Sequence, residues 1–343
     1  MADDSGMKSR RGTRLEDLAK KAGVSISTVS RALNDSPAVN RRTKQAIWKL
    51  AREHDYPFRK YMPAGPIGAD STIAIVVPIP QARESHLYDP FFFELLSGIG
   101  DAARDRGCDV LISHMAPRSY DDLAFAMETS RADGVIFIGQ SGLHVEFNQL
   151  VTSDGRFVVW GAELPEQGYC SVGSDNPQGG RRATAHLARL GRRKILFLGD
   201  VEAPEALQRY RGYQAALAQH DIDLGPDYTV PAHFEVESAE AATAGVIEAG
   251  IDFDGVVAAS DLIALGAIRS IERAGRSVPG DVSVVGYDNV PFSRYASPSL
   301  TTVSQDTSKA GRVLVSKLLD SRGQASRSER TPTELIVRES CGA

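Results

Sequence analysis

The residues best suited to chemistry lie near the N-terminus, in the stretch TRLEDLAKKAGVSISTVSRALN (13–34). Apolar residues recur there at helical spacing in two short blocks, which Gly23 separates. Thr13 followed by Glu16 predicts the start of the first helix, and Ser25 predicts the cap of the second. The second helix carries the side chains that we expect to contact phosphates and base edges, namely Ser25, Ile26, Ser27, Thr28, Arg31 and Asn34.

The charge of the chain is unevenly distributed. Residues 1–62 hold 14 of the 39 Lys and Arg residues but only 7 of the 44 Asp and Glu residues. A third helix is expected in this basic part, from a cap at Asn40 to about His54, with its charges spread around it. A basic module on an acidic body is typical of a nucleic-acid-binding domain attached to a domain of another kind.

Length and composition limit the remaining possibilities. With 343 residues there is room for two or three domains. No apolar run is long enough to cross a membrane, and MADDSGMKSRRG lacks the core of a signal peptide, so we expect a cytoplasmic protein without a membrane partner. The cysteines are odd in number and have no metal-ligand spacing, which predicts ordinary reduced thiols and neither a metal nor a cofactor; they are Cys108, Cys170 and Cys341.

Residues 57–71, PFRKYMPAGPIGADS, are expected to form a linker because prolines and glycines oppose a long helix. Beyond it, β-branched runs such as STIAIVVP and GVIFIG alternate with helical stretches. A second series of the same kind begins near residue 176, with KILFLG, GVVAAS and VSVVGYD as its strands. This alternation predicts two doubly wound α/β lobes with a cleft between the carboxyl edges of their parallel sheets.

The stretch LEDLAKKAGVSISTVSRALN resembles the N-terminal signature of the lactose-repressor (LacI/GalR) family of bacterial transcription regulators. Later segments resemble that family too, among them DPFFFELLSGIG, RYRGYQAAL, AASDLIALGAIRSI and VSVVGYDN. The resemblance implies an all-α helix-turn-helix headpiece followed by an α/β core like that of periplasmic binding proteins. The boundaries expected are a headpiece at 1–56, a hinge at 57–71 and a core at 72–340, with an N-lobe of about 72–173 and 304–330 and a C-lobe of about 174–303 and 331–340.

Several polar and aromatic residues follow the predicted strands, where ligands of such sheets bind. A carboxylate and a guanidinium can hold neighbouring hydroxyl groups, and a flat ring can cover a sugar. The family resemblance implies effector contacts at Phe91, Phe92, Arg209, Phe234, Ser260 and Asp288. Gln140 and Asp261 are added because each directly follows the end of a predicted strand. Other roles stay open for three of them: Asp261 as a helix cap, one phenylalanine of the FFF run as core, and Phe234 as loop packing.

The resemblance further implies a sequence-specific transcriptional regulator, a homodimer on a pseudo-palindromic operator. Such regulators are most often repressors released by a small sugar, although a ligand that strengthens operator binding is the alternative. A sugar-binding receptor is a second class, which the basic headpiece argues against. An enzyme using Asp261 and Asp288 is a third, but no partnered Ser–His–Asp set is evident, so no catalytic residues are expected.

The hinge departs from the family pattern, in which a leucine enters the minor groove and kinks the operator. Counting from Pro57, this chain has Phe58, Tyr61 and Ala64 where Asn, Ala and Leu are usual. Alanine is too small to separate two base pairs, so we predict a nearly straight central operator step, measured by a DNA-bending assay. A sharp kink that survives both Met62→Ala and Tyr61→Ala would contradict this prediction.

Overall fold

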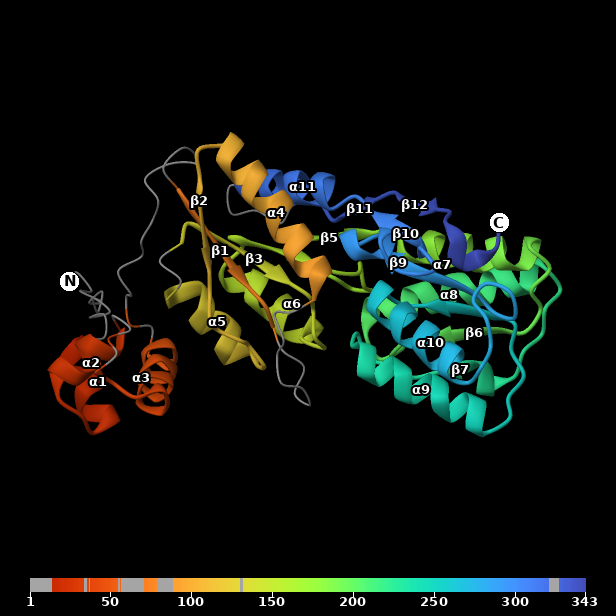
Figure 1. Cartoon of the computed structure of the whole chain (residues 1–343). Coiled ribbons are helices and arrows are strands. Elements are labelled where there is room, and N and C mark those ends of the chain that lie inside the picture. The colour runs from red at the N-terminus through yellow and green to blue at the C-terminus, as the bar shows by residue number, and fades with distance from the viewer. Residues whose placement is uncertain are drawn as a thin grey trace, which may run out of the picture.

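The computed structural model describes residues 14–33, 36, 38–54, 56, 71–78, 89–129, 132–320 and 327–343. They form a small helical headpiece and two α/β lobes, the N-lobe and the C-lobe, which lie in a row (Figure 1). Thr13, Asn34 and the hinge positions 57–70 lie outside the described residues. The expectations that concern them therefore remain predictions.

The headpiece contains α1 (Leu15–Ala22), α2 (Ile26–Leu33) and α3 (Arg41–Glu53), which share one small apolar core. Gly23 ends α1 with a φ of 65°, as its position in the sequence predicted. The Asn40 cap is also confirmed, because its Oδ1 accepts a hydrogen bond from the Thr43 backbone N–H at 2.9 Å. At the start of α1, the side chain that accepts the capping hydrogen bond is Asp17, not Glu16 as predicted. The Arg14 N–H donates to Asp17 Oδ2 at 2.9 Å.

The N-lobe is a six-stranded sheet in the order β11-β5-β4-β3-β1-β2, and all its paired strands are parallel. Its strands are β1 (Thr72–Val76), β2 (Asp109–Ile112), β3 (Gly134–Ile138), β4 (Phe157–Trp160), β5 (Ser171–Ser174) and β11 (Glu329–Thr331). One face packs against α4 (Pro90–Asp105) and α11 (Thr307–Asp320), and the other against α5 (Tyr120–Thr129) and α6 (His144–Ser153). Burial on both faces explains the nearly continuous apolar sequence of the central strands.

The C-lobe sheet has the order β12-β10-β9-β8-β6-β7, with only β12 antiparallel to its neighbour. Its strands are β6 (Ile195–Leu198), β7 (Thr229–Val230), β8 (Gly255–Ala258), β9 (Ser283–Asp288), β10 (Thr301–Gln305) and β12 (Thr333–Ile336). Its helices are α7 (Asn176–Arg189), α8 (Pro204–Gln219), α9 (Val236–Glu248) and α10 (Asp261–Arg273), with short 3₁₀ turns η1 (Pro226–Tyr228), η2 (Pro291–Arg294) and η3 (Glu339–Cys341).

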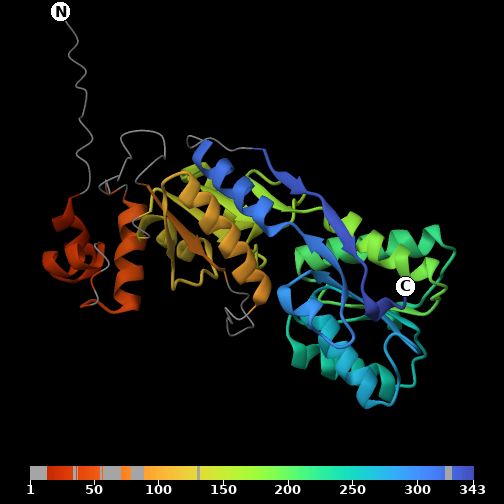
Figure 2. The same cartoon turned by 45° about the horizontal axis from the view of Figure 1, so that its top comes forward.

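The chain passes between the lobes after β5, after β10 and between β11 and β12, so each lobe is built from separated segments (Figure 2). The prediction of two doubly wound lobes behind a helical headpiece is confirmed. Helices α6 and α11 were not predicted. Within the described residues, no helix combines the length and the apolarity that crossing a membrane requires. All three cysteines are free and buried.

Helices α4 and α11 cross at a point where neither has room for a side chain. A Cβ on Gly98 would lie 2.4 Å from the carbonyl oxygen of Thr307, and a Cβ on Gly311 would lie 2.2 Å from the Gly98 carbonyl carbon. Gly100, two residues further along α4, faces open space. The close approach of the two backbones therefore depends on Gly98 and Gly311.

We predict that Gly98→Ala lowers the free energy of unfolding by about 1–3 kcal/mol, because the helices must separate to admit a methyl group. Gly100→Ala is the matched control and should be neutral or stabilising by up to about 1 kcal/mol, since alanine favours a helix. Denaturant unfolding followed by circular dichroism measures both. Equal effects of the two substitutions would contradict the packing argument.

Candidate functional site

The N-terminal end of α2 presents a cluster of hydroxyl groups to solvent. Ser25 Oγ accepts a hydrogen bond from the Thr28 N–H at 3.1 Å, which confirms Ser25 as the cap. The same oxygen lies 2.8 Å from both Ser27 Oγ and Thr28 Oγ1. Ser25 and Ser27 are exposed and Thr28 is half-buried. Hydroxyls at the positive end of a helix dipole are suited to phosphate oxygens.

Two further residues of α2 are available to read bases. Ile26 is an apolar side chain that is 48% exposed, which the headpiece core does not explain. A residue of this kind can contact a thymine methyl group. Arg31 is exposed on the same helix and can reach guanine acceptors or phosphates. Polar and apolar side chains that could read bases are therefore exposed from the first to the last turn of α2.

A buried guanidinium marks the junction between the two lobes. Arg209, on α8, is 5% exposed. Its Nε donates to Asn176 Oδ1 at 2.8 Å, and its Nη1 donates to the Ala259 carbonyl and lies 3.9 Å from Asp288 Oδ1. Its charged carbon lies 3.7 Å above the centre of the Tyr287 ring. These contacts to Asn176, Ala259, Asp288 and Tyr287 hold the guanidinium of Arg209 in one orientation.

Asp288 is the strongest candidate for a ligand-binding carboxylate. It ends β9 with a φ of 111°, a conformation that non-glycine residues rarely adopt. Its Oδ1 accepts a hydrogen bond from Gln305 Nε2 at 2.5 Å, and Gln305 in turn contacts Ser174 on β5. Strained backbone of this kind persists where the surroundings hold it, which is common at binding sites.

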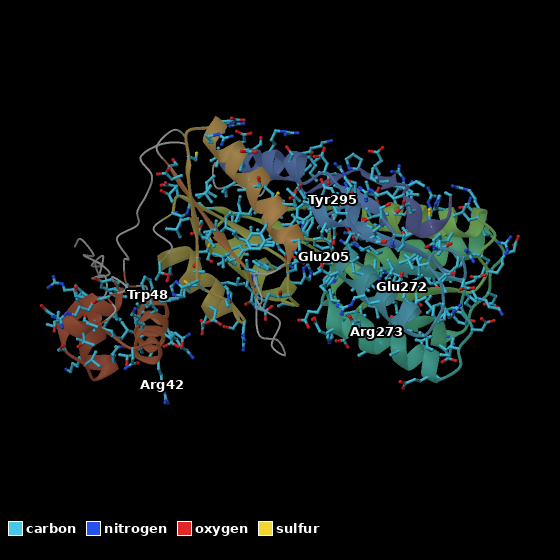
Figure 3. The ribbon with its side chains drawn as sticks, in the orientation of Figure 1. Arg42, Trp48, Glu205, Glu272, Arg273 and Tyr295 are labelled. Carbon is cyan, nitrogen blue, oxygen red and sulfur yellow. The ribbon has the colours of Figure 1, made fainter. Side chains whose placement is uncertain are left out.

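Two other carboxyl groups share the field of Arg209. Burial raises the pKa of Asp89, and the N–H of Phe91 and the charge of Arg209 oppose that rise. Burial raises the pKa of Glu205 in the same way, and the charge of Arg209 opposes part of that rise. Burial also raises the pKa of Asp288 well above its ordinary value. Figure 3 shows Glu205 between the lobes. The charge of Arg209 therefore acts on three carboxyl groups.

Three of the expected contact residues use their polar atoms within the protein. Gln140 donates to the Ala162 carbonyl and to Tyr169 Oη, and accepts from the Ala162 N–H. Ser260, not Asp261, caps α10 by accepting from the Ile263 N–H at 3.2 Å. Asp261 accepts from Thr302 Oγ1 and the Val290 N–H, and burial raises its pKa to about 7. Their role as ligand contacts remains a prediction.

The aromatic residues expected to contact the ligand differ in how deeply they are buried. Phe92 is buried in the N-lobe core, as one residue of the FFF run was expected to be. Phe91 is half-buried and its ring lies 5.8 Å from that of Trp160, at the end of β4. Phe234 packs partly buried against the C-lobe core. Phe91, which is half-buried and backed by the buried Trp160, is therefore the better candidate for covering an apolar ligand face.

Sequence reasoning missed several residues of this junction: Asp89, Asn176, Glu205, Gln305 and Trp160. Two of them carried a usable signal. Glu205 lies four residues before Arg209, a spacing that places both on one helix face. Asp89 precedes Pro90 as a helix cap, accepting from the Phe91 N–H at 2.9 Å. Among the described residues, no group of three or more His, Cys, Asp or Glu side chains could hold a metal ion.

Comparison with known proteins extends these observations. Residues 14–57 match the family described as bacterial regulatory proteins, lacI family, and residues 184–341 match the periplasmic binding protein-like domain. The chain is 31% identical to the HTH-type transcriptional regulator CelR of Thermobifida fusca, covering 97% of this chain and 100% of that one. Its fold is similar to a CelR–cellobiose complex (TM-score 0.69, 29% identity, covering 96% of this chain and 99% of that one). It is also similar to the lac repressor dimer bound to operator (TM-score 0.67, 26% identity, 97% and 100% covered).

We predict that Arg31→Ala weakens binding to the preferred duplex by about 1–3 kcal/mol per half-site, because a guanidinium paired with guanine distinguishes it from other bases. Binding to random duplex should change little. Arg42→Ala is the control, since Arg42 is exposed in the first turn of α3, outside α2 (Figure 3). Fluorescence anisotropy at fixed salt measures both. An equal loss on the two DNAs would show that Arg31 contacts only phosphate.

Proposed function

This chain belongs to the lacI family of bacterial regulatory proteins, and we propose that it is a repressor released from its operator by a small sugar held between its lobes. The observation that carries the proposal is the exposure of Ser25 and Ser27 at the start of α2 and of Arg31 in its last turn, on a basic headpiece. One such helix pair reads only a half-site, so the protein acts as a homodimer on a pseudo-palindromic operator. Its action on DNA places it in the cytoplasm.

The lobe junction supplies the groups that a sugar requires. Asp288 and Arg209 can hold adjacent hydroxyl groups through charge-assisted hydrogen bonds, and Phe91, supported by Trp160, can cover a ring face. A relative of similar fold was solved with cellobiose. That ligand is consistent with a polyhydroxylated effector here.

The charge of the junction narrows the effector class. Asp89, Glu205 and Asp288 all lie within the electrostatic reach of Arg209, whose guanidinium is already bonded to Asn176 and the Ala259 carbonyl. An added phosphate or carboxylate would meet three carboxyl groups in a poorly solvated place, which is unfavourable. We therefore propose a neutral sugar, not a sugar phosphate or a uronic acid.

Release requires the sugar to bind the DNA-incompetent state more tightly than the competent one. The alternative is a corepressor, which would bind the competent state more tightly. Selection of bound sequences from random duplex DNA, repeated with neutral sugars, sugar phosphates and uronic acids, tests both proposals. A palindromic sequence lost on adding a neutral sugar is the expected result. Enrichment strengthened by sugar would establish the corepressor, and the absence of any selected sequence would overturn the proposed function.

We predict that Arg209→Ala and Asp288→Ala abolish the sugar response but leave operator affinity within about twofold, because both lie outside the headpiece. Arg211→Ala is the matched control, an exposed arginine two residues further along α8, and should respond normally. Anisotropy titrations of the operator complex with sugar measure the response, and thermal unfolding establishes that each variant is folded. A normal titration by either variant would remove that residue from the site.

A further inference from the structure

The headpiece contacts the N-lobe through one side of α3. The Trp48 ring meets the Phe125 ring of α5 edge-on, with centroids 5.6 Å apart and planes at 85°. Beside this pair, Gln45 Nε2 donates to Asp122 Oδ1 at 3.2 Å. Figures 1 and 2 both place α3 between the rest of the headpiece and α5. Trp48 and Phe125 are 4% and 9% exposed, so both large rings are shielded from water.

Charge across this contact is complementary. A cavity of about 340 Å³ lies between the two bodies beside the aromatic pair. Lys49 of the basic headpiece lines it on one side, and Asp121 and Asp122, from the first turn of α5, line it on the other. Opposite charges facing each other favour this docking orientation over others.

Trp48 also connects the contact to the recognition helix. Its Nε1–H donates to the Ala32 carbonyl at 3.1 Å, next to Arg31 in the last turn of α2. A shift of α5 against α3 would therefore move α2 as well. The reading end of α2 remains exposed, as Ser25, Ile26 and Ser27 show, so the contact leaves the DNA-binding surface free.

We propose that α5 is a docking surface for the protein's own headpiece, and that the docked arrangement is the one that binds the operator. The proposal rests on the DNA-binding function of the family. The sequence of the linker, with its prolines and glycines, lacks the usual hinge-helix pattern. A headpiece held only by such a linker would lose much orientational freedom when two copies meet half-sites at fixed spacing. Docking on α5 removes part of that cost in advance.

A disulfide between the two bodies tests the arrangement directly. The double variant Gln45→Cys with Asp122→Cys should form, on mild oxidation, a cross-link within one chain, detected as a mobility change at monomer mass on a denaturing gel. Glu16→Cys with Asp122→Cys is the control, because α1 lies on the far side of α3 from α5 (Figures 1 and 2). The native cysteines are buried and should not compete.

The oxidised Gln45→Cys/Asp122→Cys protein should bind the selected operator duplex at least as tightly as the same protein after reduction. Loss of binding on oxidation, restored by reductant, would show that the docked state opposes DNA binding and would overturn the proposal. Equal cross-linking of the two pairs would show that α3 does not rest on α5.

A second measurement does not depend on cross-linking. Phe125→Ala should weaken operator binding about tenfold, because each half of the dimer loses an aromatic contact, with little change on random duplex. Val145→Ala, an exposed change on neighbouring α6, should have no effect. Gln45→Ala, which leaves both cores intact, should give a smaller loss in the same direction as Phe125→Ala. Parental operator affinity in Phe125→Ala and Gln45→Ala, both folded by circular dichroism, would overturn the proposal.

Discussion

The buried positive charge of Arg209 is the constraint around which the lobe junction is organised. An isolated guanidinium removed from water is strongly unfavourable unless its donors are paired. Asn176 from α7, the carbonyl of Ala259 after β8 and Asp288 at the end of β9 supply those partners. Pairing one cation therefore fixes three C-lobe elements relative to α8. The same charge opposes the rise that burial causes in the pKa of Asp89, at the start of α4 in the N-lobe.

The segments that cross between the lobes belong to the same network. Ser174 at the end of β5 contacts Gln305 at the end of β10, and Gln305 donates to Asp288. Asp288, the carboxylate proposed to bind a sugar, is thus hydrogen-bonded to Gln305 at the end of β10, a strand after which the chain passes to the other lobe. A ligand that changes the surroundings of Asp288 acts directly on the crossing strands.

Local features were predictable from the sequence, and features that depend on distant partners were not. The Gly23 stop and the Asn40 cap follow from neighbouring residues alone. Helix α11 was missed because glycine and β-branched residues lower its intrinsic helix propensity, and its packing on Gly98 is a tertiary contact. In the site, motifs pointed to Arg209 and Asp288. No local signal shows that Asp261 is bonded to Thr302, far along the chain.

The repeated passage of the chain between the lobes has a consequence for the order in which the protein is made. The headpiece core uses only residues up to Tyr56 and is complete early in synthesis. The N-lobe lacks α11 and β11, and the C-lobe lacks β12, until the last part of the chain emerges. Since domains fold as units during synthesis, a nascent chain has its DNA-reading module before the body that regulates it. Truncation near the C-terminus would leave both lobes without a strand or helix and the headpiece intact.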